Sequence, residues 1–396
     1  MENGAANNSV YLDNNATTRM DPRVLDAMLP FFCGHYGNAS SAHSMGVTVA
    51  AALRAARRQV QEMLGAAYPE EIVFTSGGSE ANNTAIVSAL ETQQERNEVV
   101  VSVVEHPSVL ALCAHLERTG RARVIRVPVR EDGSLNLDAY VAALSERTAV
   151  VSIQWANNET GVVSPIGILA GLAHDAGAVF HCDAVQAAGK IDLSVALSGV
   201  DMLSASAHKM HGPKGVGTLY VRNGIRLAPL VHGGRQERGR RAGTENTAGI
   251  VGYGEAAKIT LHSLRQKSVM IAHLRDRLEE NLLAAIPDAI VIGNKEHRLP
   301  NTLCIAFAGV EGDNILALLD QAGVIASSGS ACASGLIEPS HVLRAMQVPF
   351  DYLRGAVRFS LSRENTSACV GHVLSVLPEI VRELRTSDIS EEVLHG

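Results

Sequence analysis

Short β-branched runs alternate with segments of helical periodicity between residues 71 and 221, and this alternation constrains the fold more than any other feature of the chain. Most of the runs are apolar on both faces, as expected for strands that are covered on both sides. The alternation predicts an α/β domain with a mainly parallel sheet. The expected strands are 71–75, 98–102, 123–127, 149–153, 178–182 and 218–221, and the expected helices are 46–64, 80–95, 108–118, 137–145 and 165–175.

A second, smaller α+β unit is expected beyond this region. A helical pattern covers 247–285, and its charged residues predict a solvated helix; they are Arg265, Lys267, Arg275, Arg277 and Glu279. The chain of 396 residues is too long for one ordinary core, because single cores stop growing near 250–300 residues. We therefore expect a large domain over 15–260 and a small domain made of 1–14 and 261–396. The small domain is predicted to contain strands at 302–307, 324–327 and 356–361 and a closing helix at 367–385.

Composition excludes several classes of protein. Apolar residues make up 46% and charged residues 19% of the chain, which excludes a disordered protein. The net charge is −7, which argues against a general nucleic-acid binder. The sequence has no run of about 18 apolar residues that would span a membrane. Its first residues lack the pattern of a signal peptide. We expect a cytoplasmic protein.

Six scattered cysteines form no CxxC pair and no dense framework, so neither a zinc site nor a disulfide scaffold is expected. Cys332 lies in the Gly/Ser-rich segment 327–335, where nothing nearby in the sequence can build an apolar pocket. We therefore interpret Cys332 as a nucleophile or a carrier of sulfur rather than as a buried packing residue. Four others fit the common pattern of a small buried residue; they are Cys33, Cys113, Cys304 and Cys369.

Polar clusters follow several of the expected strands, where ligands bind in open α/β sheets. Residues 75–80, Thr-Ser-Gly-Gly-Ser-Glu, lie between a strand and a helix and fit a phosphate cradle, although an ordinary turn is equally compatible. Asp183 could pair with a protonated ring nitrogen or be structural. His181 and Asp183 share a strand face, but no third metal ligand is evident.

Two basic segments are also candidates. Lys209 and Lys214 follow an apolar strand in a Gly/Pro-containing loop, and either could form a Schiff base if its amine is kept neutral. Spacing does not choose between them, and a solvated lysine is the ordinary alternative. Residues 233–246 contain four arginines and four glycines, which indicates either an anion-binding loop or a flexible basic surface loop.

Taken together, the motifs of this chain resemble those of the cysteine desulfurases, which are pyridoxal-phosphate enzymes of the aspartate-aminotransferase fold (fold type I). The resemblance covers about residues 10–385 and implies a large domain with a mainly parallel seven-stranded sheet and a smaller α+β domain. Ser327-Ser-Gly-Ser-Ala-Cys332 resembles the long-loop class, and other motifs look closest to the nitrogen-fixation type. The matching segments are 11–18, 74–80, 105–107, 157–161, 183–186, 208–209, 238–244 and 327–332.

The resemblance assigns cofactor roles residue by residue. Lys209 matches the lysine that bonds to pyridoxal phosphate, Asp183 the acid that pairs with its ring nitrogen, and His106 the imidazole stacked on its ring. Gln186 matches the group beside the ring hydroxyl. Thr244 matches a phosphate ligand given by the other subunit, which implies a homodimer. The other phosphate-binding positions are Gly78, Ser79, Ser206 and His208.

The resemblance also assigns the chemistry. Asn158 and Arg358 match residues that hold the substrate carboxylate, and Cys332 matches the catalytic cysteine. The implied reaction converts L-cysteine to L-alanine and leaves a persulfide, whose sulfur passes to an iron-sulfur scaffold protein. In the nitrogen-fixation type, this sulfur is used for nitrogenase clusters. Ala333 and Leu336 depart from the usual loop residues. Selenocysteine lyase, aminotransferase and non-catalytic scaffold functions are the alternatives.

Overall fold

The computed structural model describes residues 9–328 and 339–395, and its largest element is a seven-stranded sheet. Only β8 runs antiparallel to its neighbours, and every other adjacent pair is parallel. The predicted α/β class with a mainly parallel seven-stranded sheet is confirmed. The spatial order is β2 (Ile72–Thr75), β8 (Gly217–Val221), β7 (Met202–Ser206), β6 (Val179–Asp183), β5 (Thr148–Ser152), β3 (Glu98–Ser102) and β4 (Arg123–Val127).

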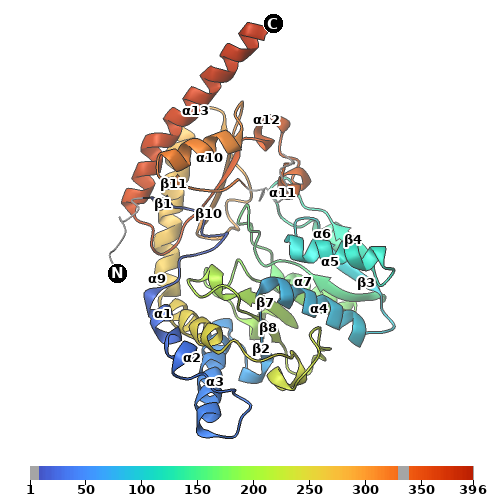
Figure 1. Cartoon of the computed structure of the whole chain (residues 1–396). Helices are drawn as coiled ribbons and strands as arrows, with labels where there is room; N and C mark the ends of the chain where they lie inside the picture. The colour runs from blue at the N-terminus through green and yellow to red at the C-terminus, as the bar shows by residue number, and fades with distance from the viewer. Residues whose placement is uncertain (1–8, 329–338, 396) are drawn as a thin grey trace.

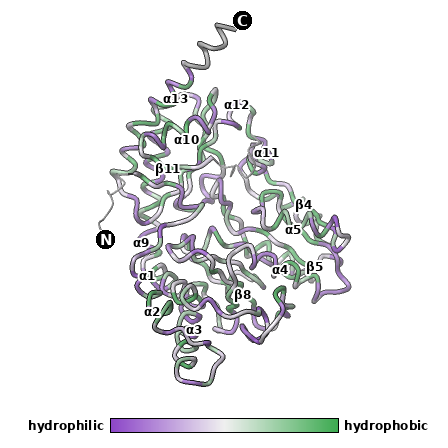
Figure 2. The backbone as a smooth tube through the Cα atoms, viewed as in Figure 1, coloured by the Kyte–Doolittle hydropathy of each residue, from purple (hydrophilic) through white to green (hydrophobic). Residues whose placement is uncertain are grey.

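Helices cover both faces of this sheet, which explains why its strands are apolar on both sides (Figure 1). On β3, Val99 and Val101 pack in the cluster under α4 (Gly78–Thr92) and α5 (Pro107–Arg118), whereas Val100 belongs to the cluster on the opposite face. Green hydrophobic stretches lie within the body of the molecule around α4, α5 and β8 (Figure 2). The opposite face is covered by α3 (Ser44–Leu64), α6 (Leu137–Ala143), α7 (Ile166–Asp175) and the first part of α9 (Thr247–Ala285).

Short helical elements connect these layers and border the sheet. Helix α1 packs against α9, and α2 follows α1 directly. The turn η2 follows β7 directly and carries Lys209. These elements are α1 (Pro22–Met28), α2 (Pro30–Cys33), η1 (Pro69–Glu71), α8 (Val195–Ser198), η2 (Ala207–Lys209) and η3 (Gln236–Gly239).

A second apolar cluster surrounds a smaller antiparallel sheet in the upper part of the view (Figure 1). Near the start of the described chain, β1 (Val10–Tyr11) pairs in parallel with β11 (Val324–Ile325). The division into domains 15–260 and 1–14 with 261–396 stays a prediction. The smaller sheet has the order β12 (Ala356–Ser360), β10 (Thr302–Phe307) and β9 (Ala289–Val291), and the helices around it are α10 (Gly312–Gln321), α11 (His341–Ala345), α12 (Phe350–Leu353) and α13 (Ser367–His395).

Helix α9 has the predicted bounds, but the expectation that its charged residues are solvated is wrong for two of them. Arg275 and Glu279 are each only 7% exposed. The Arg275 guanidinium donates to the Leu299 carbonyl over 2.7 Å, and Glu279 pairs with Arg298 over 2.6 Å. Arg275 also pairs with the adjacent Asp276 over 2.6 Å. Arg298 and Leu299 lie outside the helix, so periodicity within the helix carries no sign of their contacts.

The cysteines are less uniform than expected. Cys113 and Cys304 are buried as predicted, whereas Cys33 is exposed, which contradicts its assignment as a packed residue. Cys369 is intermediate, and Cys332 lies outside the described residues. Within residues 9–328 and 339–395, no helix has the length and apolar character needed to cross a membrane.

Candidate active site

Nine of the predicted site residues line one cavity of about 230 Å³. The cavity lies where β2, β3, β5, β6 and β7 end, because the carboxyl ends of strands that run in the same direction meet at one edge of a sheet. Five further residues, which the sequence analysis did not select, complete the lining: Asn82, Ser108, Gln154, Ala156 and Val185. The nine predicted ones are Gly78, Ser79, His106, Asn158, Asp183, Gln186, Ser206, His208 and Lys209.

The start of α4 forms the anion-binding end of this cavity. The first N–H groups of a helix have no acceptor within the helix, and its dipole favours an anion there. Gly78 is required by packing, because a Cβ at this position would lie 2.6 Å from Cγ2 of Val185. Ser79, Ser206 and His208 add polar groups around the cavity. These groups together suit a phosphate.

Asp183 presents a carboxylate to the cavity from the last position of β6. It is 6% exposed and accepts hydrogen bonds from Asn82 Nδ2 at 2.7 Å and from the Val185 amide at 2.9 Å. These bonds fix the carboxylate, which can then pair with a cationic nitrogen of a bound ring. Within the described chain, Asn82 Oδ1 is buried and has no partner.

His181, two residues earlier on β6, is bonded on both ring nitrogens. Its Nδ1 pairs with Ser152 Oγ at 2.8 Å and its Nε2 with Ser204 Oγ at 2.9 Å. Burial lowers its pKa to about 3. The described residues contain no group of three His, Cys, Asp or Glu side chains arranged to hold a metal.

Lys209 is the lysine that lines the cavity, whereas Lys214 is exposed outside it. The Lys209 amine donates to the main-chain carbonyls of Asn15 at 2.5 Å and Ala16 at 2.7 Å. Burial, together with the charge of Arg358, lowers the pKa of Lys209 from 10.5 to about 8. About a tenth of the amine is therefore neutral at pH 7, far more than for an ordinary lysine, and a neutral amine can attack a carbonyl carbon.

His106 caps the N-terminus of α5 and lines the cavity. Its Nδ1 accepts a hydrogen bond from the Ser108 amide at 3.1 Å, so the neutral ring carries its proton on Nε2. Loss of solvation lowers the pKa of His106, and the positive charge of Lys209 lowers it further, while Asp183 opposes them. The imidazole is therefore mainly neutral and suited to stacking on a ring.

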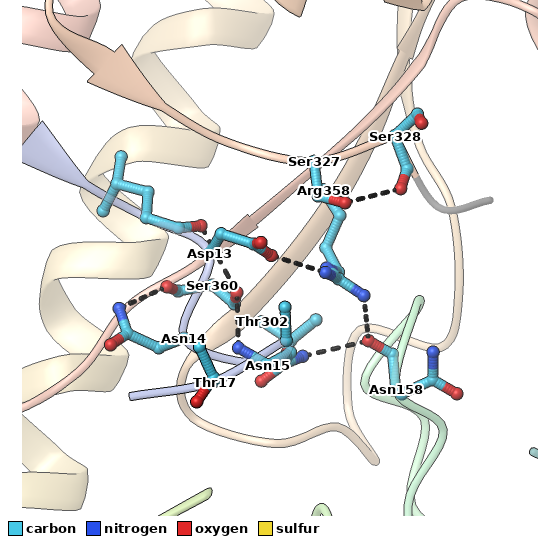
Figure 3. A network of polar contacts seen from close by, with 12 residues as sticks. Asp13, Asn14, Asn15, Thr17, Asn158, Thr302, Ser327, Ser328, Arg358 and Ser360 are labelled. Atoms are coloured by element: carbon cyan, nitrogen blue, oxygen red, sulfur yellow. Dashed lines mark hydrogen bonds and ion pairs between the residues drawn. The ribbon is translucent and has the colours of Figure 1, made fainter. Parts of the chain in front are cut away.

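Arg358 lies beside the cavity, in a polar network that links the two sheets (Figure 3). Its guanidinium pairs with Asp13 over 2.6 Å and donates to the Asn158 carbonyl over 3.1 Å. Its Nε is buried and has no partner within the described part of the chain. The side chain is 5% exposed, so the cation is held in one place near Asn158.

Three predicted residues are not among those that line this cavity. Arg358 lies beside it, and Thr244 is exposed and does not line it. Cys332 lies outside the described residues. In the arginine-rich loop 233–246, two of the four arginines are already engaged in ion pairs. Arg238 pairs with Glu70, and Arg241 pairs with Glu80.

Known proteins resemble this chain along nearly its whole length. The family described as Aminotransferase class-V matches residues 10–373. A cysteine desulfurase from Gluconacetobacter diazotrophicus is 58% identical over 96% of this chain and 94% of its own. Cysteine desulfurase NifS from Azotobacter vinelandii is 52% identical over 95% of this chain and 93% of its own. A solved structure of a NIFS-like protein is 38% identical, covers 95% of this chain and 100% of its own, and has a TM-score of 0.89.

Proposed function

The chain belongs to the class-V aminotransferase family and, within it, to the pyridoxal-phosphate-dependent cysteine desulfurases, and on this premise we propose that it converts L-cysteine to L-alanine and carries the released sulfur as a persulfide on Cys332. The observation that carries the proposal is the single cavity that collects an aspartate, a lysine of lowered pKa, a histidine and a helix N-terminus. These are the groups that the reaction requires.

The residues present fit pyridoxal phosphate. Gly78 and Ser79 at the start of α4, with Ser206 and His208, would hold the phosphate. Asp183 would hold the ring nitrogen in its protonated form. When bound, the cofactor supplies an electron sink that stabilises negative charge on the substrate carbon skeleton.

Lys209 is proposed as the group that binds the cofactor and moves protons. Its lowered pKa keeps the amine available as a base, and the Asn15 and Ala16 carbonyls orient it. The His106 imidazole would stack on the ring and exclude water from that face.

The pH dependence of cofactor capture tests the state of Lys209. Only the neutral amine attacks the aldehyde. In cofactor-free protein, the rate at which the lysine-bound chromophore forms should rise with pH, with a midpoint near the pKa of about 8, and then level off. Stopped-flow absorbance against pH measures this rate. A midpoint near 10.5, the ordinary value for lysine, would contradict the desolvated environment.

Arg358 and Asn158 are proposed to hold the substrate carboxylate. Supporting this, Arg358 is a buried guanidinium that donates a hydrogen bond to Asn158, and its Nε has no partner among residues 9–328 and 339–395. Ser327 also pairs with Arg358 through two main-chain hydrogen bonds, of 2.7 and 3.3 Å. The segment that carries Cys332 therefore begins next to the proposed carboxylate site.

The sulfur-transfer step is a nucleophilic attack by Cys332. Its thiolate attacks the substrate sulfur, and a new S–S bond forms as the Cβ–S bond breaks. The electron pair of the broken bond goes to Cβ, which takes a proton and becomes the methyl group of L-alanine. Cys332 keeps the sulfur as a persulfide, and no outside oxidant or reductant is needed.

A homodimer is proposed because Thr244 matches a ligand that serves the partner's phosphate. In one chain Thr244 is exposed and away from the cavity. Large apolar side chains are also exposed on and beside α1–α3, as expected for a surface that pairs. They include Leu25, Leu29, Phe32, Tyr36, Met45 and Val47.

The destination of the sulfur is proposed to be an iron-sulfur scaffold protein in the cytoplasm, serving nitrogenase clusters. The support is the similarity to a protein named NifS, together with Ser362. Cysteine desulfurases of the housekeeping type, which serve general cluster assembly, usually have glycine at this position. Transfer of labelled sulfur from the loaded enzyme to a purified nitrogenase-type scaffold, compared with a general scaffold, tests this assignment.

Product analysis separates the proposed reaction from the alternatives. With L-cysteine and a reducing thiol, the enzyme should release L-alanine and sulfide in equal amounts, as measured by amino-acid analysis and a sulfide assay. A keto acid without sulfide would indicate an aminotransferase. Bound iron and no alanine would indicate a scaffold, and a strong preference for selenocysteine would indicate a selenocysteine lyase.

A further inference from the structure

Lys190 is a buried amine to which neither the motifs nor the proposed mechanism gives a role. It is 9% exposed and follows the cavity residue Gln186 by four positions. Its Nζ donates to Gln186 Oε1 at 2.6 Å and to Asn15 Oδ1 at 2.7 Å. Burial lowers the pKa of Lys190 well below its usual value, and the charges of Lys209 and Arg358 act in the same direction. Two donated hydrogen bonds are available to this group whether it is an ammonium or an amine.

These contacts determine which way the Gln186 amide faces. One end of the amide lies against the main-chain carbonyl of Asn15, which can only accept, so this end is the nitrogen, at 2.9 Å. The other end accepts from Lys190. Nε2 carries two hydrogens, and the Asn15 carbonyl takes one. The second N–H is left for the cavity that Gln186 lines, which therefore meets a donor.

The same amine fixes the side chain of Asn15, which is 1% exposed. Asn15 Oδ1 accepts from Lys190 and from Asn301 Nδ2 at 3.0 Å. Asn15 Nδ2 donates to the Asn158 carbonyl at 3.0 Å, as Figure 3 shows, and to Thr302 Oγ1 at 2.9 Å. Every polar group of this side chain is therefore satisfied in one orientation.

The main chain of Asn15 connects this arrangement to the catalytic lysine. Its carbonyl accepts both the Lys209 amine, at 2.5 Å, and Gln186 Nε2. Lys190 therefore fixes the side chain of Asn15, whose main-chain carbonyl accepts from the Lys209 amine. Lys190 also donates directly to the Gln186 amide. Loss of Lys190 would leave the buried Gln186 Oε1 without its donor, and the Asn15 carbonyl alone would then hold the amide.

We propose that Lys190 is a positioning residue that fixes the Gln186 amide with an N–H directed to the cofactor's ring oxygen and fixes Asn15 beside Lys209. The inference rests on the proposed function, because it takes the ring hydroxyl to lie next to Gln186. A donor there stabilises negative charge on the ring oxygen, whereas an amide turned the other way would place two acceptors against each other.

Lys190→Met tests the proposal, because methionine is of similar length and has no donor. The purified variant should show a shifted visible absorption maximum of the lysine-bound cofactor, and cofactor-free variant should bind pyridoxal phosphate about tenfold more weakly. Lys267→Met is the matched control. Lys267 is a half-buried lysine on α9 that borders the same small cavity as Lys190, and within the described chain it makes no hydrogen bond to Gln186 or Asn15. It should leave both readouts unchanged.

A double-mutant cycle separates positioning from a general structural effect. Gln186→Leu should shift the absorption maximum, and adding Lys190→Met to it should cause no further shift. Lys190→Arg keeps a donor and should restore most of the cofactor affinity. If the methionine variant does not fold by circular dichroism, Lys190→Leu, which also has no donor, replaces it.

The outcomes distinguish this inference from the proposed function. A shifted Gln186→Leu spectrum together with an unchanged Lys190→Met spectrum would overturn the role of Lys190 alone. Fully additive shifts in the cycle would overturn the positioning of the Gln186 amide by Lys190, because Lys190 would then act independently of Gln186. An unchanged Gln186→Leu spectrum would overturn the placement of the ring hydroxyl beside Gln186, and the present inference with it.

Discussion

The Lys209→Ala variant should bind pyridoxal phosphate without the visible absorbance of a lysine-bound cofactor and should turn over L-cysteine about 100- to 10,000-fold more slowly. Two functions are lost together. The amine that bonds to the cofactor is removed, and so is the base that the Asn15 and Ala16 carbonyls orient in the cavity. Absorbance spectra and alanine release from the purified variant measure the two effects separately.

Lys214→Ala is the matched control for this experiment. Lys214 lies five residues further along the same loop and is exposed, whereas Lys209 lines the cavity. The control variant should keep the chromophore and nearly normal activity. If Lys214→Ala loses the chromophore and Lys209→Ala keeps it, the assignment of the lysine is wrong.

The Cys332→Ala variant should keep the lysine-bound chromophore and lose cysteine desulfurase turnover by at least about a thousand-fold, as expected when the nucleophile of a covalent mechanism is removed. The proposed contacts to the phosphate and the ring come from described residues that line the cavity, so binding of pyridoxal phosphate should be unaffected. The absorbance spectrum reports the first property, and sulfide release from L-cysteine reports the second.

Cys33→Ala provides the comparison for Cys332→Ala. Cys33 is an exposed free thiol that does not line the cavity, so Cys33→Ala shows the effect of removing a cysteine that has no role in the proposed mechanism. Loss of turnover only in Cys332→Ala supports a specific nucleophile. Normal turnover in Cys332→Ala would remove Cys332 from the mechanism.

Much of the site was predictable because it depends on local sequence patterns. A strand that ends in Asp183 and another followed by Lys209 place both residues at the same edge of a mainly parallel sheet. Gly78 could be predicted in the same way, since a glycine between a strand and a helix indicates a close approach. The motifs, rather than the spacing, favoured Lys209 over Lys214, and the structure has Lys209 at the cavity.

Contacts between distant segments were not predictable. Asn82 on α4 donates to Asp183 on β6. Lys190 donates to Asn15, which precedes it by 175 residues. Nothing in their neighbouring residues marks them as polar contacts of the site, because the partners come together only in the folded chain. The burial of Arg275 escaped prediction for the same reason, since its acceptor is the Leu299 carbonyl.

The exposed Cys33 shows a related limit. Its neighbours are apolar, which is typical of a packed residue, and yet Phe32 beside it is also exposed. An apolar surface of this kind is covered only when another chain binds to it, so the sequence of one chain describes it incompletely.

Mass spectrometry of the enzyme after one anaerobic turnover without added thiol shows whether Cys332 receives the sulfur of L-cysteine. We expect the peptide containing Cys332 to gain the mass of one sulfur atom, with one L-alanine released per modified site, and the added mass to disappear on reduction. L-alanine formation with the added sulfur on another cysteine, or on none, would contradict this expectation.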